Sequence, residues 1–240
     1  MALAIALVVL SAACNAAAPT TSSGPSESAR PSASPSAVAE SSTPPPCALV
    51  CTAGAHSTRS LQPSLTFMVP DGWAPRDDNP SEFVLVPTST SDAGIYLFRE
   101  PVAHLQTTDC RAARDPSVAT DPRALGSWIA SLSGLKATPL KTVTVGGLSG
   151  VTFDVTVAAT WTHACPYSNG APFVPMIMSA VPGSDLDWGL GAGGGMRVVI
   201  LNAGGGRTLW IDFEATTLGT YNAVLKEAAP ILDSFVFAIG

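Results

Sequence analysis

The chain contains 240 residues, of which 46% are hydrophobic and 12% are charged, and its formal net charge at pH 7 is −6. This acidic balance argues against a nucleic-acid partner, because proteins that bind nucleic acids carry a basic patch or stripe. The apolar content suffices for the core of one domain of ordinary size.

An apolar run opens the chain, in the sequence MALAIALVVLSAAC. It is too short to span a bilayer, which takes about 20 apolar residues, but it has the length of a signal-peptide core. The small residues before Cys14 resemble the lipobox of bacterial lipoproteins. That resemblance implies removal of residues 1–13, acylation of Cys14 and a position on the extracytoplasmic face of the cell membrane. An ordinary secretory signal with a chance cysteine is the alternative.

Residues 15–46 are rich in Ser, Pro, Ala and Thr and contain no aromatic side chain. Such a segment cannot bury enough apolar surface to offset the entropy of ordering it. A random coil of this length spans about 30 Å. We therefore expect residues 14–46 to form a disordered linker that begins at the lipidated cysteine. Residues 47–240 are expected to form a single domain, which the linker holds off the membrane surface.

Four further cysteines, Cys47, Cys51, Cys110 and Cys165, predict two disulfides in an exported chain. Three pairings are possible. We favour Cys47–Cys51 with Cys110–Cys165, because the first pair closes a small loop where the linker meets the domain. The second would stabilise the fold by about 4 kcal/mol. A zinc site of Cys47, Cys51 and His56 is the alternative, but a C-x3-C spacing with one histidine is thin evidence, and we expect neither metal nor cofactor.

Strands are predicted where apolar and polar residues alternate. Short candidates lie at Leu65–Val69, Phe83–Pro87, Ile95–Phe98 and Phe173–Ala180. Two hairpins are also expected. The first joins Thr142–Val145 to Val151–Val157 through a Gly-Gly pair, and the second joins Arg197–Leu201 to Thr208–Phe213 through three glycines.

Two helices are predicted between and after these strands. Asp121 and Pro122 form a cap and first turn, and apolar residues follow with helical spacing through Leu132, so the helix is expected to end near Gly134. Near the C-terminus, residues 221–228 share one apolar face, and Pro230 is expected to kink or break that helix.

This order of elements predicts an α+β fold, in which an antiparallel sheet built from hairpins carries two packed helices. Four segments add a resemblance: Phe67–Trp73 (FMVPDGW), the central helix, the hairpin around VTVGGLSGVTFDV, and Pro230–Phe235 (PILDSF). Together they resemble actinobacterial-type envelope lipoproteins with a PsbP-like sandwich domain. The resemblance implies a non-catalytic binding or assembly role and supplies no catalytic residues.

Gly189, Gly191 and Gly194 fit the G-x-G-x-x-G spacing of dinucleotide-binding loops. That loop requires a strand before it and a helix after it, so that the helix N-terminus meets the pyrophosphate. Here a predicted strand, Met196–Leu201, follows the glycines. We therefore interpret them as a flexible turn that leads into a strand.

Three patterns could support catalysis. Ser133 and Lys136 fit the S-x-x-K motif of penicillin-binding enzymes, but Ser133 falls at the end of the predicted helix and Gly134 interrupts the motif. A small secreted hydrolase could use His56, His104 or His163 as its base, although His104 and His163 are expected on surface loops beside the 110–165 disulfide. Asp185 and Asp187 could act as an acid–base pair, but loop carboxylates are usually only solvated.

Binding is the favoured function. Trp73, Trp161 and Trp188 are predicted in loops or at strand ends, where an aromatic face could meet a sugar ring, a lipid or a protein; partial burial is the alternative for each. The chain is therefore predicted to be a membrane-anchored lipoprotein whose domain binds an envelope protein, lipid or glycan. A small hydrolase and a purely structural spacer are the alternatives.

Overall fold

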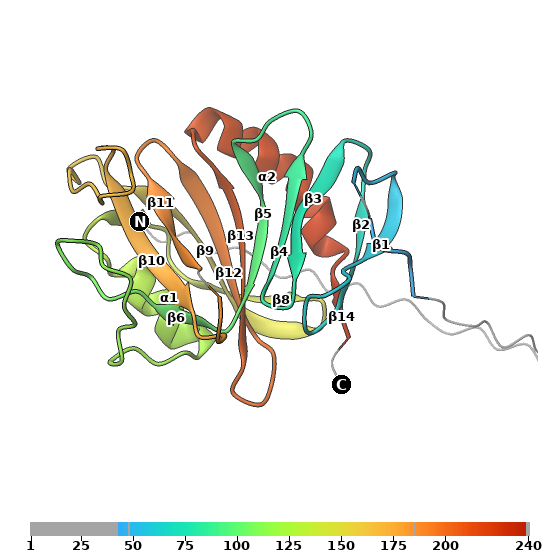
Figure 1. The fold of residues 1–240 in the computed structure, drawn as a ribbon, viewed down its shortest axis with the longest axis horizontal. Helices are drawn as coiled ribbons and strands as arrows, with labels where there is room; N and C mark the ends of the chain where they lie inside the picture. Colours follow the sequence, from blue (N-terminus) through green and yellow to red (C-terminus); the bar gives the residue numbers. More distant parts are fainter. Residues whose placement is uncertain (1–42, 48, 185, 239–240) are drawn as a thin grey trace, which may run out of the picture. The chain divides into compact units, whose positions relative to one another are not determined.

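The computed structural model describes residues 43–47, 49–184 and 186–238 (Figure 1). The predicted signal segment, Cys14 and nearly all of the predicted linker lie outside these described residues, as does Asp185. Within the described ranges, neither helix is long and apolar enough to cross a membrane.

An antiparallel sheet of eight strands forms the centre of the described region, in the order β3-β4-β5-β13-β12-β9-β7, with β8 also paired to β9. Both predicted hairpins are confirmed: β8 turns into β9 at Val145 and Leu148, and β12 pairs with β13 along its whole length. The strands are β3 (Trp73–Asn79), β4 (Glu82–Pro87), β5 (Ala93–Arg99), β7 (Leu135–Ala137), β8 (Lys141–Val145), β9 (Leu148–Val157), β12 (Gly195–Asn202) and β13 (Thr208–Ala215).

Two three-stranded sheets flank the central one at opposite ends of the view in Figure 1. One contains β1 (Gly54–Ser57), β2 (Leu65–Val69) and β14 (Val236–Phe237). The other contains β6 (Pro101–Ala103), β10 (Phe173–Ser179) and β11 (Asp187–Gly191).

The first helix, α1 (Pro122–Ala130), begins as the sequence predicts. The Asp121 side chain caps it by accepting a hydrogen bond from the Ala124 N–H at 3.0 Å. The helix ends earlier than predicted, however, so Leu132 lies beyond it rather than in its last turn. Ser131 forms the C-cap, and its hydroxyl donates to the Trp128 carbonyl at 2.6 Å, which satisfies an orphan acceptor at this end.

The second helix, α2 (Leu218–Asp233), continues through Pro230, so the expected break at this residue is wrong, while the expected kink stays a prediction. Proline removes one backbone donor from the helix. Around this site Ala228 and Ile231 are buried against the central sheet, and the Ser234 N–H and hydroxyl both donate to the Ile231 carbonyl. We attribute the continuation of the helix to this burial and capping.

The central sheet is covered on both faces. Along β13, Leu209, Ile211 and Phe213 pack into the core beneath α2, whereas Trp210 packs into a second core formed with α1, β10 and β11. Because side chains alternate along a strand, Asp212 and Glu214 face the same side as Trp210. The predicted α+β class, an antiparallel sheet with two helices, is confirmed, and its helices lie on opposite faces of that sheet.

Candidate ligand-binding cleft

Two cavities adjoin at Asp187 and Trp188 on β11. The larger, of about 600 Å³, lies between the β3–β4 turn and residues 181–184 and 186–188. The smaller, of about 420 Å³, is lined by residues of β11, the β11–β12 turn, the end of β13 and two aromatic side chains, Tyr167 and Phe173. We name this smaller cavity the β11 cleft. It falls in the size range of small-molecule sites, about 300–1,000 Å³.

Trp188 forms one wall of the β11 cleft and is fixed from below by the central sheet. Its ring centroid lies 4.7 Å from that of Tyr96 and 5.2 Å from that of Phe98, two residues that alternate onto the same face of β5. The indole Nε1 is buried and makes no hydrogen bond of standard geometry, although it lies close enough to the Asp212 carboxyl group to lower the pKa of that acid. Of the three tryptophans predicted to bind ligand, Trp188 is the one that lines this cleft.

The other two tryptophans lie elsewhere. Trp73 begins β3 and is only 2% exposed, within the core beneath α2, so its predicted role in binding is wrong: the ring is a packing residue. Trp161 is partly buried, and its Nε1 donates to the Phe173 carbonyl at 2.9 Å. It lines a separate cavity of about 300 Å³ together with His163 and Pro175.

Two acidic residues that sequence reasoning missed lie on β13 beside Trp188. Asp212 is fully buried; its Oδ2 accepts a hydrogen bond from the Trp210 indole at 2.5 Å, while its Oδ1 has no partner. Burial, then the nearby Glu214, raise the pKa of Asp212 well above its usual value, although the indoles of Trp210 and Trp188 act in the opposite direction. Glu214 is partly exposed and lines the cleft.

Glu214 also titrates far from its ordinary range. Burial raises its pKa to about 8, against the effect of the Arg76 guanidinium. Arg76 lies over the Tyr96 ring at 5.2 Å and pairs with Asp77 at 3.4 Å on the surface, so it does not form an ion pair with Glu214. Burial likewise raises the pKa of Tyr96 to about 12. The cleft thus combines aromatic rings with Glu214, a carboxyl group that favours its protonated form, while Asp212 favours its protonated form within the core.

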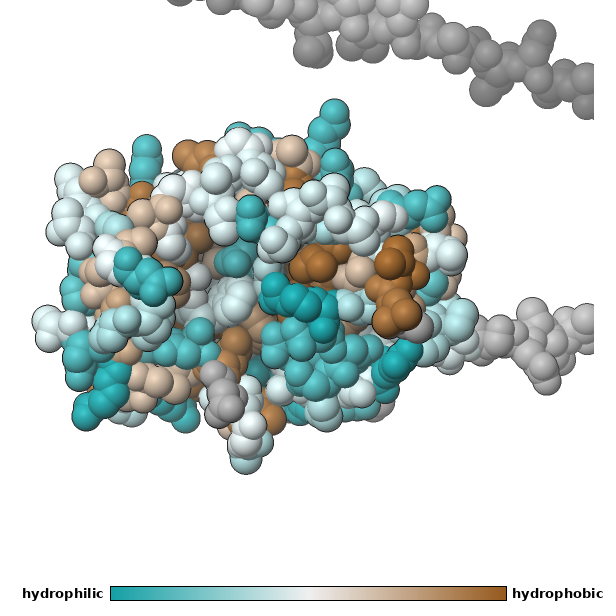
Figure 2. Space-filling view, turned by 45° about the horizontal axis from the view of Figure 1, so that its top comes forward, coloured by the Kyte–Doolittle hydropathy of each residue, from teal (hydrophilic) through white to brown (hydrophobic). Residues whose placement is uncertain are grey.

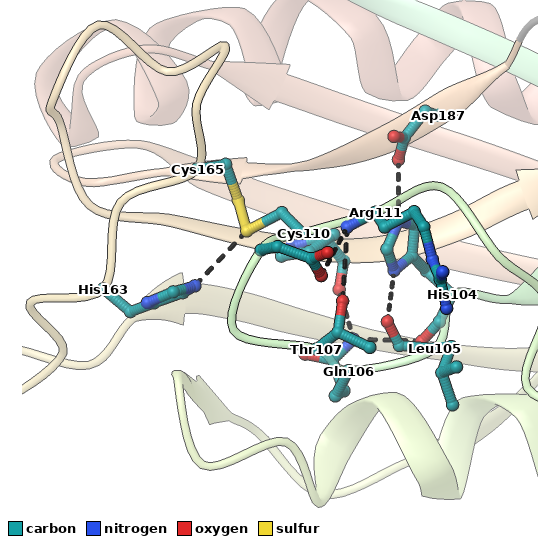
Figure 3. Close-up of polar contacts among 11 residues, drawn as sticks. His104, Leu105, Gln106, Thr107, Cys110, Arg111, His163, Cys165 and Asp187 are labelled. Carbon is teal, nitrogen blue, oxygen red and sulfur yellow. Dashed lines mark hydrogen bonds and ion pairs between the residues drawn. A yellow bond between two sulfur atoms is a disulfide. The ribbon is translucent and has the colours of Figure 1, made fainter.

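The three histidines do not lie together. His104 is completely buried, which corrects the prediction that it lies on a surface loop: β10 and β11 cover it. Its Nδ1 lies 2.8 Å from the Leu105 carbonyl and its Nε2 3.4 Å from Asp187 Oδ1 (Figure 3). His163 is half-buried, with Nε2 3.3 Å from Cys110 Sγ. Nε2 of His56 contacts the Thr52 carbonyl at 2.8 Å. Within the described ranges, no serine or threonine hydroxyl bonds to a histidine.

The cysteines pair as Cys47–Cys51 and Cys110–Cys165, the connectivity favoured from the sequence. Cys110, His163 and Cys165 place their ligand atoms within 4.8 Å of one another, but both sulfur atoms belong to the disulfide. The alternative zinc site meets the same obstacle, since Cys47 and Cys51 are joined to each other. Metals bind thiolates, so either site would require reduction first.

The structure also shows where the glycines of the G-x-G-x-x-G pattern and the residues of the S-x-x-K motif lie. Gly189 and Gly191 lie within β11 rather than in a flexible turn, which corrects the prediction; the turn is shorter and contains Gly193 and Gly194. A Cβ atom on Gly189 would lie 2.2 Å from the Val174 carbonyl oxygen, so close pairing with β10 explains the residue. Ser133 lies in the turn before β7, which contains Lys136, so the motif is not helical.

Figure 2 shows a mostly hydrophilic face on which hydrophobic residues gather in small groups rather than in one continuous patch. Large continuous apolar patches mark protein or membrane contacts. On this face, concave cavities are therefore better candidates for binding than a flat apolar surface.

Comparisons with known proteins were made for sequence and for fold. No family model and no curated protein matches the sequence. Similar solved structures include PsbP (CyanoP) from Synechocystis sp. PCC 6803, which is 12% identical over 80% of this chain and 97% of its own, with a TM-score of 0.41. LpqN of Mycobacterium tuberculosis, described as involved in cell envelope biogenesis, is 11% identical over 78% and 86%, with a TM-score of 0.40.

A protein of Bacteroides thetaiotaomicron is also similar, at 9% identity and a TM-score of 0.35 over 72% of this chain. This chain spans 45% of that protein's length. These are similarities of fold, and the chemistry of the β11 cleft rests on its own residues.

Proposed function

We propose that this protein is a lipid-anchored extracytoplasmic lipoprotein whose domain binds a ligand or protein partner, without catalysis, in the β11 cleft. The lipobox-like sequence at Cys14 and the Ser/Pro-rich segment after it support the anchor. The observation that carries the binding site is Trp188: a half-buried indole forms the wall of a 420 Å³ cleft that Tyr167 and Phe173 also line. An envelope protein, a lipid and a glycan are the candidate partners.

Site-specific photocrosslinking in intact cells tests the cleft. Benzoylphenylalanine replaces Tyr167, which lines the cleft and is 50% exposed, or Val236, which lies on β14 and is 60% exposed. We expect adducts from position 167, identified by mass spectrometry, that are absent from position 236 and are lost when Trp188→Ala is added. Equal adducts from both positions, or adducts indifferent to Trp188→Ala, contradict binding in the β11 cleft.

The anchor has its own test. Cys14→Ser removes the acceptor of the acyl chains, and one acyl chain already gives only marginal membrane binding, so the protein without any should leave the membrane fraction. The mature protein is followed by fractionation, and its N-terminal peptide by mass spectrometry. A Cys14→Ser protein that stays in the membrane fraction as firmly as the original contradicts the proposed anchor.

A small hydrolase is the competing function, and one observation favours it: the buried His104 faces Asp187, which lines both cavities. A base held by a carboxylate is the arrangement that hydrolases use. Replacing His56, His104 and His163 by Gln separates the two proposals. A folded triple variant with an unchanged envelope phenotype counts against the hydrolase, whereas a lost phenotype with a native melting temperature counts for it.

A further inference from the structure

Asp212 and Glu214 have no positive partner in the protein. Within the described ranges, the ion pairs join Arg76 to Asp77, Arg99 to Glu100, His104 to Asp187, and Arg197 to Asp154. None of these pairs includes Asp212 or Glu214. Asp212 is completely buried, where it favours its protonated form with the Trp210 and Trp188 indoles beside it, whereas Glu214 lines the β11 cleft. A positive charge is therefore absent beside Glu214, the one of these two acids that reaches the cleft.

The groups around Glu214 come from four elements. They are Arg76 on β3, Tyr96 on β5, Asp212 on β13 and Asp187 on β11, with Tyr167 on the loop before β10. Burial opposes the charged form of Glu214, and Arg76 favours it. Asp187 Oδ1 lies 3.4 Å from Nε2 of His104, without a hydrogen bond of standard geometry between them. The balance leaves Glu214 with a proton near neutral pH, and an entering cation can replace that proton.

The walls of the cleft are suited to an organic cation. Tyr167 and Phe173 meet edge to face with ring centroids 5.5 Å apart, and Trp188 lies among the same lining residues. Ammonium and guanidinium groups are attracted to aromatic faces, with an energy that increases when water is excluded. Glycines 189, 191 and 194 form part of the remaining wall, and a Cβ on Gly194 would lie 3.0 Å from Leu190 Cδ1.

We propose that the β11 cleft binds an organic monocation, a protonated amine or a guanidinium with a flat apolar portion. The positive group lies against Glu214, and the apolar portion lies between Trp188, Tyr167 and Phe173, all of which line the cleft. This inference rests on the proposed function of the cleft and names the chemistry of its ligand. A divalent metal fits less well, because calcium takes six to eight oxygen ligands and Asp187 and Glu214 are the only two carboxyl groups among the described residues that line this cleft.

Binding also exchanges a proton. The free carboxylic acid of Glu214 releases one proton to solvent as it becomes the carboxylate that faces the cation. Affinity should therefore rise as the pH increases from 6 to 8.5, over which Glu214 loses its proton in the free protein.

The test uses the full chain purified in a non-ionic detergent, with phenethylammonium as the probe. Two matched compounds of the same shape, 2-phenylethanol and phenylacetate, carry no charge and a negative charge. Isothermal titration in buffers of different ionisation enthalpy gives the affinity and the number of protons released. We expect phenethylammonium to bind at least about tenfold more tightly than either analogue, with proton release at pH 6.5.

Three variants locate the site. Glu214→Gln should weaken phenethylammonium by about tenfold and abolish the proton release, while leaving 2-phenylethanol unchanged. Glu227→Gln, the same change at an exposed position of α2 on the opposite face, should alter nothing. Tyr167→Ala removes an aromatic wall from an exposed position and should weaken phenethylammonium more than 2-phenylethanol. It keeps the inference testable if Glu214→Gln fails to fold, which thermal melting will show.

Each contrary outcome has a separate meaning. Equal binding of 2-phenylethanol or phenylacetate, lost with Trp188→Ala, overturns the cation while leaving the cleft as a binding site. Calcium binding that Glu214→Gln abolishes, without binding of phenethylammonium, overturns the organic cation in favour of a metal. Failure of every probe to bind overturns the cation, and the crosslinking from position 167 then decides the proposed function independently.

Discussion

Two groups of carboxylates, on opposite faces of the central sheet, differ in whether a cation of the protein pairs with them. Asp154 on β9 accepts hydrogen bonds from Arg197 at 2.7 and 3.1 Å and from the Tyr221 hydroxyl at 2.9 Å. Asp212 and Glu214, two strands away, have no such cation. Burial would raise the pKa of Asp154, but the hydrogen bonds from Arg197 and Tyr221 hold it below its usual value. The pKa values of Asp212 and Glu214 are raised instead.

This difference distinguishes acids that stabilise the fold from acids that are available to bind a ligand. At Asp154 the protein supplies its own counter-charge and joins β9, β12 and α2 in a closed network. At Asp212 and Glu214 the counter-charge is absent and a cavity lies beside the acids. Acids that are paired within the fold stabilise it. Acids left unpaired beside a cavity reduce its stability until a cation binds.

The largest predicted effect is the pH dependence of stability at Glu214. Its pKa is 4.5 in an unfolded chain and about 8 in the fold, so the folded state binds more protons between these values. The contribution of Glu214 to stability is therefore fully present below pH 4.5 and is lost as the pH rises to 8, by roughly 4 kcal/mol. Urea unfolding between pH 5 and 8.5 measures this fall. Glu214→Gln should flatten it, and a slope that persists in that variant contradicts the assignment.

Asp212→Asn should also reduce the fall in stability at high pH, by a smaller amount than Glu214→Gln. The amide keeps an acceptor for the Trp210 indole and carries no charge, so the cost of keeping the acid protonated disappears as the pH rises. The new amide donor lies where Oδ1 has no partner, and this offsets part of the gain. We expect stabilisation by roughly 1–2 kcal/mol at pH 8 and little change at pH 4. Destabilisation at pH 8 would mean that the charged form is needed.

Asp154→Asn tests the other side of the comparison, with the opposite pH dependence. Because the pKa of Asp154 is lowered in the fold, its contribution is present at neutral pH and is lost as the pH falls below its ordinary value of 3.8. The pair with Arg197 is about one-third exposed, so solvent screening limits the loss to about 1 kcal/mol at pH 7. A double-mutant cycle with Arg197→Met measures the pair directly, and a coupling energy near zero contradicts its structural role.

The sequence predicts the hairpins of the central sheet better than it predicts strand β11 and the acids beside the cleft. The hairpins of β8–β9 and β12–β13 were predictable because alternation and glycine pairs are local signals. Strand β11 was not, because its glycines resemble a loop and its pairing with β10 comes from distant residues. Trp188 was a candidate from its residue type, but Asp212 and Glu214 were not, since only the covering of both faces of the sheet buries them. The signal available was two acids on one face of a strand that is otherwise apolar.

The smallest predicted effect isolates the hydroxyl that links α2 to the paired acid. Tyr221→Phe removes the hydrogen bond to Asp154 Oδ1 and keeps the ring, which packs in the core beneath α2. Arg197 still occupies both carboxylate oxygens, so no buried acceptor loses its last partner, and the loss should be about 0.5–1 kcal/mol at pH 7. It should shrink below pH 3, because protonated Asp154 is a weaker acceptor. Phe213→Leu serves as a packing control, whose loss of stability should not depend on pH in this range. An equal loss from Tyr221→Phe at every pH would mean that the tyrosine contributes through packing and not through its hydrogen bond to the charged Asp154.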